Sequence, residues 1–359
     1  MARATATTTD EEIIMQFKPS AAWLWRQWRG TALQYTWKPT VLNMLVGIVI
    51  TFSIRQIGSR QGFFWALGTV PSESVPIVAK LASLNVMWQH QLSLTTFIIT
   101  FFLGQAYTFW RQQFSLARGI QGRLMQMALL LSTHATRDES GRYTPQAEAM
   151  LEATSRNLKL LQIVFWAGQT DEFKVLLEGD ALKELEPAGV ISASELAVLL
   201  AGTESTPRLR HDVVLGWLMM RALAGQSNGA LRDSEAFSHE FTSQATRLHG
   251  TCGGIMDNQE DRMPLAYVHI VQVLIDSLMV LTPAALYPKV GVFSVPLAGL
   301  LTVFYRGLLE LAKCFLDPFN GDDETDVNVN VLLAEANGLG RFAQTQTTLP
   351  DDLTGMSLK

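Results

Sequence analysis

The sequence predicts an all-α integral membrane protein with four membrane-spanning helices around a helical soluble domain. Only 17% of the 359 residues are charged, against roughly 25% in an ordinary soluble domain. Mean hydropathy is nevertheless only +0.16, so the apolar residues must be concentrated in a few segments. Strand-like alternation is almost absent, whereas apolar residues recur at helical spacing between polar ones.

Four apolar segments approach or reach the roughly 20 helical residues that cross about 30 Å of hydrocarbon. We place them at residues 37–56, 92–110, 264–288 and 289–311. The second is the clearest, because it carries no charge and ends with Tyr107 and Trp110, which suit an interfacial aromatic belt. The last two follow each other directly, which predicts a tight helical hairpin.

The remaining segments follow from these boundaries. They are an amino-terminal segment (1–36), a connecting loop (57–91), a helical soluble domain (111–263), an acidic motif with its following segment (312–335) and a mobile tail (336–359). Four crossings place both termini and the soluble domain in one compartment. Basic residues flank the first two spans on that side, so the positive-inside rule makes the compartment cytosol-like or stroma-like.

Several classes of protein are disfavoured. The net charge of −5 and the lack of clustered Lys and Arg argue against a nucleic-acid partner. The acidic residues Asp10, Glu11 and Glu12 come before any apolar run, which is wrong for a secretory signal or a transit peptide. No nucleophile, base and orienting group can be placed together, so we do not expect an enzyme.

One face of the second span has the composition of a pore lining. Ser93, Phe97, Phe101 and Gln105 are each four residues apart and share one face of a helix. Phenylalanine edges presented to a narrow axis would favour anions weakly, and a dry constriction can gate by dewetting. The same spacing is also typical of helix packing or lipid contact, so the pattern alone leaves both interpretations open.

Several motifs of the chain match those of a known family. The most specific is ALYPKVGVFSVPLAGLLTVFYRGLLELAKCFLDPFNGDDETD, residues 285–326. The others are Trp28-Arg29-Gly30, Phe97 with residues 101–104 (FFLG), and residues 250–254 (GTCGG). Together they resemble the bestrophin family, including its plant and algal members, over about residues 25–335. The last three motifs are similar to that family's amino-terminal motif, its neck and the approach to its third span, respectively.

This resemblance implies a pentamer of identical subunits whose second spans line a central anion pore. It implies a passive flow of chloride or bicarbonate, and the photosynthetic members suggest a thylakoid membrane, with a plasma membrane as the alternative. Trp217 and Arg232-Asp233 keep the family's spacing, which carries its cytosolic aperture residue onto Leu223. Gln105 departs from the aromatic residue usual at the family's third neck ring, which predicts a wetter neck.

Calcium control is a further implication of the resemblance. Asp322, Asp323, Glu324 and Asp326 supply the hard oxygen ligands that Ca²⁺ prefers, and Asp317 begins a rigid turn whose carbonyls could complete the shell. The run is not an EF-hand, because the alternating ligands and the distant bidentate glutamate are missing. A solvated acidic loop is the alternative. Gly321 and Thr325 interrupt the pattern of the animal members.

Two other functions remain open at this stage. A proton- or ion-coupled anion carrier would use Asp276 and His269 in the third span, and a membrane scaffold would conduct nothing. Asp276 is costly in lipid and should face protein or water, which favours a buried polar contact between subunits. Arg306 and Glu310 lie four apart and are expected to pair. His249 and Cys252 lack further metal ligands nearby, which favours a structural role.

Overall fold

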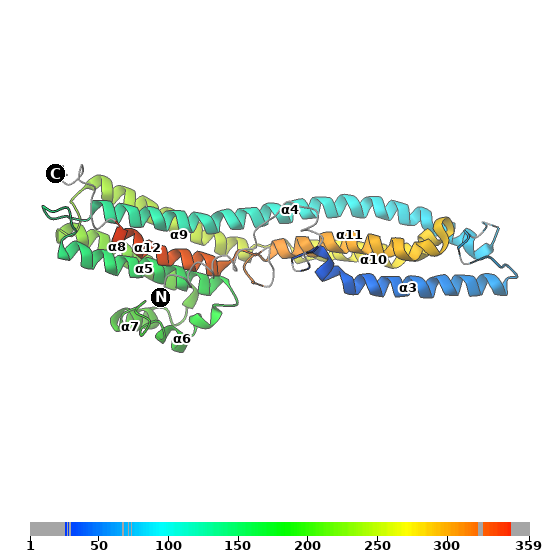
Figure 1. Cartoon of the computed structure of the whole chain (residues 1–359), viewed down its shortest axis with the longest axis horizontal. Helices are drawn as coiled ribbons and strands as arrows, with labels where there is room; N and C mark the ends of the chain where they lie inside the picture. The colour runs from blue at the N-terminus through cyan, green and yellow to red at the C-terminus, as the bar shows by residue number, and fades with distance from the viewer. Residues whose placement is uncertain are drawn as a thin grey trace.

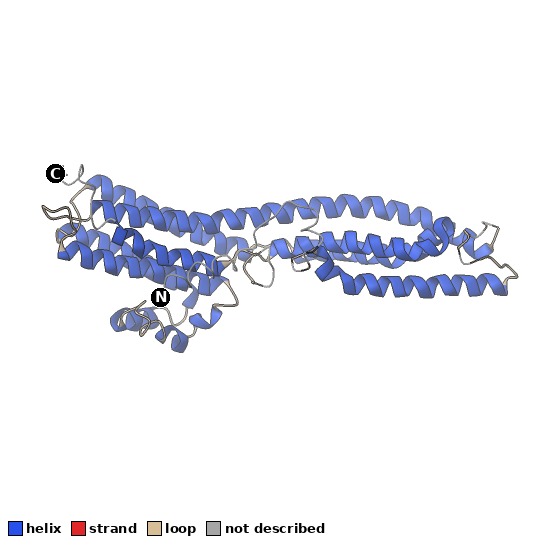
Figure 2. Ribbon diagram, viewed as in Figure 1, coloured by secondary structure: helices blue, strands red, loops and turns tan. Residues whose placement is uncertain are grey.

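The protein is an elongated assembly of helices. The computed structural model describes residues 26, 28, 30–66, 68–70, 72, 74–321 and 326–345. Its helices run mostly along one long axis, and Figure 2 shows no strand among the described residues (Figure 1). The only extended pairings in this part of the chain are two isolated bridges, Ala135 with Leu231 and Arg137 with Tyr143. The all-α prediction is confirmed.

Two groups of helices occupy the two ends of the molecule. The apolar end contains α3 (Ala32–Arg60), α10 (Leu265–Val290), η3 (Gly291–Phe293) and α11 (Ser294–Leu316). The other end contains α5 (Pro145–Gln169), η1 (Lys174–Leu177), α6 (Gly179–Lys183), α7 (Ala193–Gly202), η2 (Pro207–Leu209), α8 (Arg210–Ser227), α9 (Glu235–Glu260) and α12 (Val329–Thr345). Helix α4 (Pro76–His134) belongs to both (Figure 1).

Three helical stretches of the described chain are long and apolar enough to cross a membrane: Ala32–Arg60, Pro76–His134 and Leu265–Leu316. The third stretch is folded back on itself. Gly291 has a φ of +58°, and a Cβ there would lie 3.2 Å from the Thr69 carbonyl oxygen. Only glycine accepts this turn without strain. The result is a hairpin in which α10 and α11 pack side by side (Figure 1).

Helix α3 packs closely on this hairpin because small residues line the contact. A Cβ added at Gly299 would lie 2.8 Å from Met44 Sδ, and one added at Gly307 would lie 3.1 Å from Ala32 Cβ. The buried Asn43 amide also donates a hydrogen bond of 2.7 Å to Thr302 Oγ1. Close backbone approach and interhelical hydrogen bonds are the usual basis of helix association in lipid, where the hydrophobic effect gives little discrimination.

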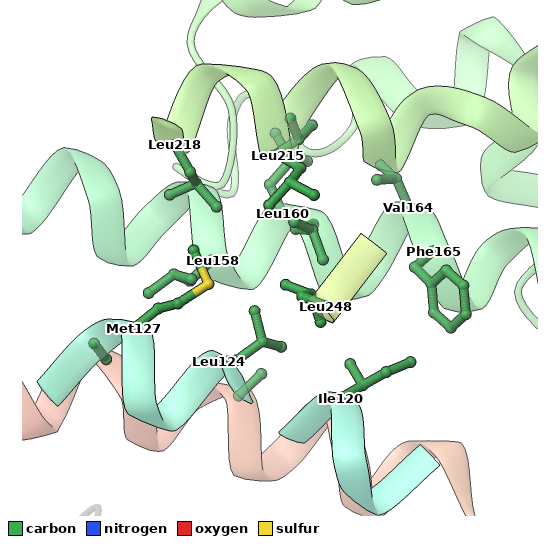
Figure 3. Close-up of a cluster of buried hydrophobic side chains, with 14 of the residues drawn as sticks. Ile120, Leu124, Met127, Leu158, Leu160, Val164, Phe165, Leu215, Leu218 and Leu248 are labelled. Carbon is green, nitrogen blue, oxygen red and sulfur yellow. The ribbon is translucent and has the colours of Figure 1, made fainter. Parts of the chain in front are cut away.

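The soluble domain has a conventional apolar core. Figure 3 shows side chains of α4, α5, α8 and α9 converging. The labelled members are Ile120, Leu124, Met127, Leu158, Leu160, Val164, Phe165, Leu215, Leu218 and Leu248. Each is at most 6% exposed, so water is excluded and burial stabilises the domain by about 25 cal/mol per Å² of apolar surface.

Helix α4 is much longer than the span predicted at residues 92–110. It has 59 residues, or about 90 Å at 1.5 Å per residue. It begins at Pro76, inside the segment predicted as a loop at 57–91, and continues far into the predicted soluble domain. Hydropathy marks only the part of a helix that lies in hydrocarbon. The flanking turns are amphipathic and pack on α10 at one end and on α9 at the other.

The first ten residues of the predicted mobile tail, 336–345, are helical. Helix α12 covers Val329–Thr345 and packs against α5 and α4. Val329, Leu332 and Ala336 are buried at helical spacing in the core of the soluble domain. The short apolar face lies among polar residues, which is why it is inconspicuous in the sequence.

Candidate functional site

The rotation of α4 about its own axis is fixed by a row of polar contacts to the hairpin. We call its four α4 members, Asn85, Trp88, Gln91 and Thr96, the polar seam. Their partners are the Ala285 carbonyl (2.8 Å), Thr282 Oγ1 (2.9 Å), Ser277 Oγ (2.6 Å) and the Tyr305 hydroxyl (2.7 Å), respectively. Within a membrane such contacts are worth about 0.6–2 kcal/mol each. Their directionality also selects one rotation of the helix.

The polar seam turns the four predicted neck residues away from the rest of the subunit. Phe97 is 71% exposed and Phe101 is 58% exposed, and Ser93 and Gln105 are also exposed. The intervening Ile99 and Phe102 are buried against the hairpin. The structure therefore brings Ser93, Phe97, Phe101 and Gln105 onto one outward surface. Packing inside the subunit therefore does not explain why large apolar residues occupy positions 97 and 101.

Most of the apolar surface of the spans is free in a single subunit. Only 22% of the most apolar window of α4 is buried within the chain, and the corresponding share for the other two stretches is 28%. The exposed part must face lipid or other copies of the chain. The contacts that α4 makes with the hairpin leave its phenylalanine face available for either environment.

Leu223, the predicted aperture residue, is also on the surface. It is 57% exposed on α8, and Met220, one turn earlier, is 59% exposed. A leucine in a helix is a core residue by default, and this default does not hold here. Phe97 and Leu223 lie on different elements, α4 and α8, within the two different groups of helices.

A buried carboxylate anchors the part of α8 that precedes Leu223. Glu195 of α7 accepts contacts from Arg221 Nη2 at 2.7 Å and Arg156 Nη2 at 3.2 Å, which joins α5, α7 and α8. Burial acts to raise the pKa of Glu195, but the hydrogen bonds from Ser192 and the two guanidinium charges outweigh it, so the pKa lies below its ordinary value. Two residues after Arg221, Leu223 is thus held on a fixed helix.

Beside this anchor lies an open cavity of about 280 Å³. Ser194, Glu195, Val198, Trp217, Met220 and Arg221 line it. Because α7 and α8 form its two walls, the cavity lies next to the surface that carries Leu223.

Asp276 pairs within its own subunit, and the expectation of a contact between subunits is not needed to explain it. Its carboxylate lies 2.8 Å from Arg306 Nη2 and accepts a hydrogen bond of 2.9 Å from Gln272 Nε2. The predicted pair of Arg306 and Glu310 is confirmed at 3.6 Å. The pairing joins α10 to α11 across the hairpin, and this partnership could not be read from residues 30 positions apart in the sequence.

The described ends of the acidic segment, residues 317–321 and 326–328, lie at the junction between the two groups of helices (Figure 1). Asp317 pairs with Arg262, just beyond α9, at 3.0 Å. Phe319 is buried against Trp166, and the Val327 amide donates to the Pro318 carbonyl at 2.8 Å, so both ends of the segment are fixed. Asp322, Asp323 and Glu324 lie outside the described residues. No group of three metal-ligating side chains converges within the described part of the chain.

The sequence reasoning missed the polar seam. Asn85, Trp88 and Gln91 lie in the segment predicted to be a loop, and Thr96 is one of several hydroxyl residues in the predicted second span. A signal was available, because the spacing of these residues by three to five positions puts polar groups on one face of an otherwise apolar helix.

The fold and the site define an all-helical membrane protein that presents a phenylalanine-bearing span on its surface. A sequence model described as "Bestrophin, RFP-TM, chloride channel" matches residues 22–338. This match includes most of the chain, and the chain belongs to the bestrophin family. By that description the family consists of chloride channels, and the fold here is one that supports anion conduction.

Solved structures with the same fold include a bacterial bestrophin homologue from Klebsiella pneumoniae. It is 15% identical, with a TM-score of 0.61, and the match covers 87% of this chain and 98% of the homologue. A point variant of that homologue is 14% identical with a TM-score of 0.64, covering 88% and 99% of the two chains. None of the curated protein sequences compared with the chain matches it significantly. These similarities do not support a special relationship to photosynthetic members.

Replacing Asp276 with asparagine tests the role of the hairpin ion pair. The amide cannot neutralise Arg306, which keeps only the more distant Glu310, so we expect a loss of about 1–3 kcal/mol in unfolding free energy. Conduction should persist, because the carboxylate is a structural partner. Thermal unfolding in detergent and bilayer currents under a pH gradient measure the two effects. Glu310→Gln, which removes the weaker partner, is the control and should cost less. A proton-dependent reversal potential that Asp276→Asn abolishes would instead establish a proton-coupled carrier.

Proposed function

We propose that the chain is one subunit of a pentameric anion channel in which five copies of α4 surround the pore. The observation that carries the proposal is the outward exposure of Phe97 and Phe101 on a face that the polar seam holds away from the subunit. Such a face can meet lipid or other copies of the chain. A ring of identical helices would place its phenylalanines around a conduit.

The proposed channel crosses the membrane four times per subunit, with α10 and α11 as separate spans. The hairpin at Gly291 supports this, because each of its helices has at least 23 residues, enough for about 30 Å of hydrocarbon. Both termini and the soluble domain then share the compartment that the basic flanking residues make cytosol-like or stroma-like. A thylakoid location stays a prediction from resemblance, which imaging of a fluorescently tagged chain in the source cells would test.

Selectivity in this proposal arises from weak electrostatics at a dry neck. The edges of phenyl rings carry partial positive charge, so rings of Phe97 and Phe101 stabilise a partly dehydrated anion without binding it tightly. Loose interactions of this kind let an ion leave as readily as it enters. Such a neck would pass chloride and bicarbonate alike. Ser93 and Gln105 on either side supply polar groups at which the anion regains hydrogen bonds.

Alanine substitution at the neck tests the proposal. Phe97→Ala and Phe101→Ala should each enlarge the unitary current and reduce selectivity for chloride over sodium, because a wider and wetter neck loses both ring edges and dewetting. Subunit stability should change by no more than about 0.5 kcal/mol, since neither ring is packed inside the subunit. Single-channel recordings in planar bilayers measure the currents.

Phe304→Ala is the matched control, because Phe304 is 54% exposed on α11 and thus lies on a different span. It should leave conduction as in the unmodified channel. Gating and selectivity that are unchanged in both neck variants would remove α4 from the pore and refute the proposal.

A second constriction is proposed at Leu223. In the pentamer its exposed side chain would narrow the exit of the pore in the soluble domain, so Leu223→Ala should raise the permeability of large anions relative to chloride. Bi-ionic reversal potentials with anions of increasing size measure this. Met220→Ala, on the same helix and equally exposed, is the control and should have a smaller effect. An unaltered permeability sequence in Leu223→Ala would exclude Leu223 from the aperture.

Calcium control is proposed for the acidic segment, whose described ends lie at the junction of spans and soluble domain. Asp317 is paired with Arg262, and Asp322, Asp323, Glu324 and Asp326 are the proposed carboxylate ligands. Open probability should rise with Ca²⁺ in the unmodified channel and lose that dependence in Asp322→Asn and Asp323→Asn. Equal open probability with Ca²⁺ and with a chelator would show that the segment is only a solvated loop.

A further inference from the structure

Two histidines from different helices share one carboxylate oxygen at the start of α8. His211 Nε2 lies 3.4 Å from Asp212 Oδ1, and His249 Nε2 of α9 lies 3.3 Å from the same oxygen. The side chains differ in access to water: that of His211 is 4% exposed, whereas that of His249 is 62% exposed. The cluster joins the helix that carries Leu223 to the helix that leads into the third span.

The tautomer of His211 is set by its other nitrogen. Nδ1 lies 3.0 Å from the carbonyl oxygen of Arg208, which can only accept, so Nδ1 must carry a proton. A neutral His211 therefore presents the lone pair of Nε2 to Asp212 Oδ1. Two acceptors face each other, and this buried carboxylate oxygen has no hydrogen-bond donor among the described residues. An N–H at the Nε2 of either imidazole resolves the conflict, and a neutral His249 can carry one there.

His249 is the ring that can supply this N–H to Asp212. It is open to solvent, and its Nε2 lies 3.3 Å from Asp212 Oδ1, a contact that ties α9 to α8. A proton added to His211 would have to enter a buried ring, beside the ring of Phe165 at 5.2 Å between centroids. It would place a positive charge out of water and bring a second N–H to the same carboxylate oxygen.

The surroundings of His211 oppose that proton. Burial lowers the pKa of His211, and the charge of His249 lowers it further, while Asp212 and the Arg208 carbonyl act in the opposite direction. Asp212 also acts on Cys252 of α9, whose thiol pKa is raised by burial and by the Asp212 charge. A thiol that stays protonated is a poor metal ligand, and no group of three side chains in the described chain is arranged to hold a metal ion. The cluster is therefore suited to protons.

We propose that His211, Asp212 and His249 form a proton-operated latch between α8 and α9. The contact between His249 and Asp212 closes the latch, and a proton on His211, which brings a competing N–H to the same oxygen, releases it, so the pH around the soluble domain controls the position of α8. The effect on current rests on the proposed function, because it requires that Leu223 on α8 lines the pore. The latch itself does not depend on conduction.

Neighbouring contacts explain how the latch could act along α8. The adjacent Arg210 is buried and donates to the carbonyl of Leu177 at 2.8 Å and to Thr203 Oγ1 at 3.1 Å, so the start of α8 is held to η1 and to the end of α7. The far half of the helix is held through Arg221 to Glu195. When the contact between His249 and Asp212 breaks, α9 no longer restrains α8, but the contacts of Arg210 and Arg221 remain. They permit α8 to tilt without unfolding.

The sign of the pH effect follows from the lowered pKa. Above the ordinary histidine value of about 6.5, His211 is neutral in both the folded and the unfolded chain. Below it, the unfolded chain takes up a proton that the folded chain resists, so unfolding becomes easier as the pH falls toward the folded pKa. Removing the charge of His249 should weaken this loss. Removing the charge of Asp212 should strengthen it.

Thermal unfolding of the full chain in detergent tests the latch without any need for current. We would follow tryptophan fluorescence from pH 8 to pH 5 in the presence of EDTA, for the unmodified protein, Asp212→Asn, His249→Gln and His211→Gln. The acid-induced fall in Tm should be largest for Asp212→Asn, intermediate for the unmodified protein and smaller for His249→Gln and His211→Gln. His239→Gln, an exposed histidine on the same α9, is the control and should behave as the unmodified protein does.

The same pH profile in all these proteins would refute the latch. Its effect on current is tested by acidifying the soluble-domain side of a planar bilayer. The current of the unmodified channel should respond, and that of His211→Gln should not. A full pH response in His211→Gln would refute the coupling to α8. A protein that carries no current at any pH, with the Tm order intact, would refute the channel proposal and leave the latch standing.

Discussion

The rotational setting of α4 is the constraint on which the rest of the structure depends. A helix in lipid gains little from burying one apolar face instead of another, because lipid tails are as apolar as leucine. Directional hydrogen bonds therefore determine which face of α4 packs on the hairpin. Asn85, Trp88, Gln91 and Thr96 each find a partner on the hairpin, and this leaves Phe97 and Phe101 on the opposite side. The proposed neck of the pore follows from that orientation.

The continuity of α4 gives the orientation a second consequence. The helix runs unbroken from the apolar end into the core of the soluble domain, where Leu124 and Met127 are fully buried. A rotation at one end would have to be matched at the other, because a continuous helix transmits torsion. The core in Figure 3 therefore helps to hold the neck residues, and changes on α8 and α9 lie within reach of the same rigid element.

The sequence predicted the helical class, the apolar stretches and the shared face of Ser93, Phe97, Phe101 and Gln105, because these follow from composition and from a periodicity of 3.6 residues. It could not predict how far α4 extends, since charged residues such as Arg111 and Arg118 end a span but not a helix. The sequence also could not predict side-chain contacts between residues that lie far apart along the chain. Asp276 with Arg306, and His211 with His249, are brought together only by tertiary packing.

The central claim is that α4 stands at the axis of a ring of identical subunits, with its phenylalanine face inward. Electron microscopy of single particles of the purified chain in lipid nanodiscs tests it most directly, since one image set gives both the subunit number and the position of α4. The account predicts a fivefold ring in which residues 93–105 of every copy surround a central hole. A particle in which this segment lies on the outer wall against lipid would contradict it.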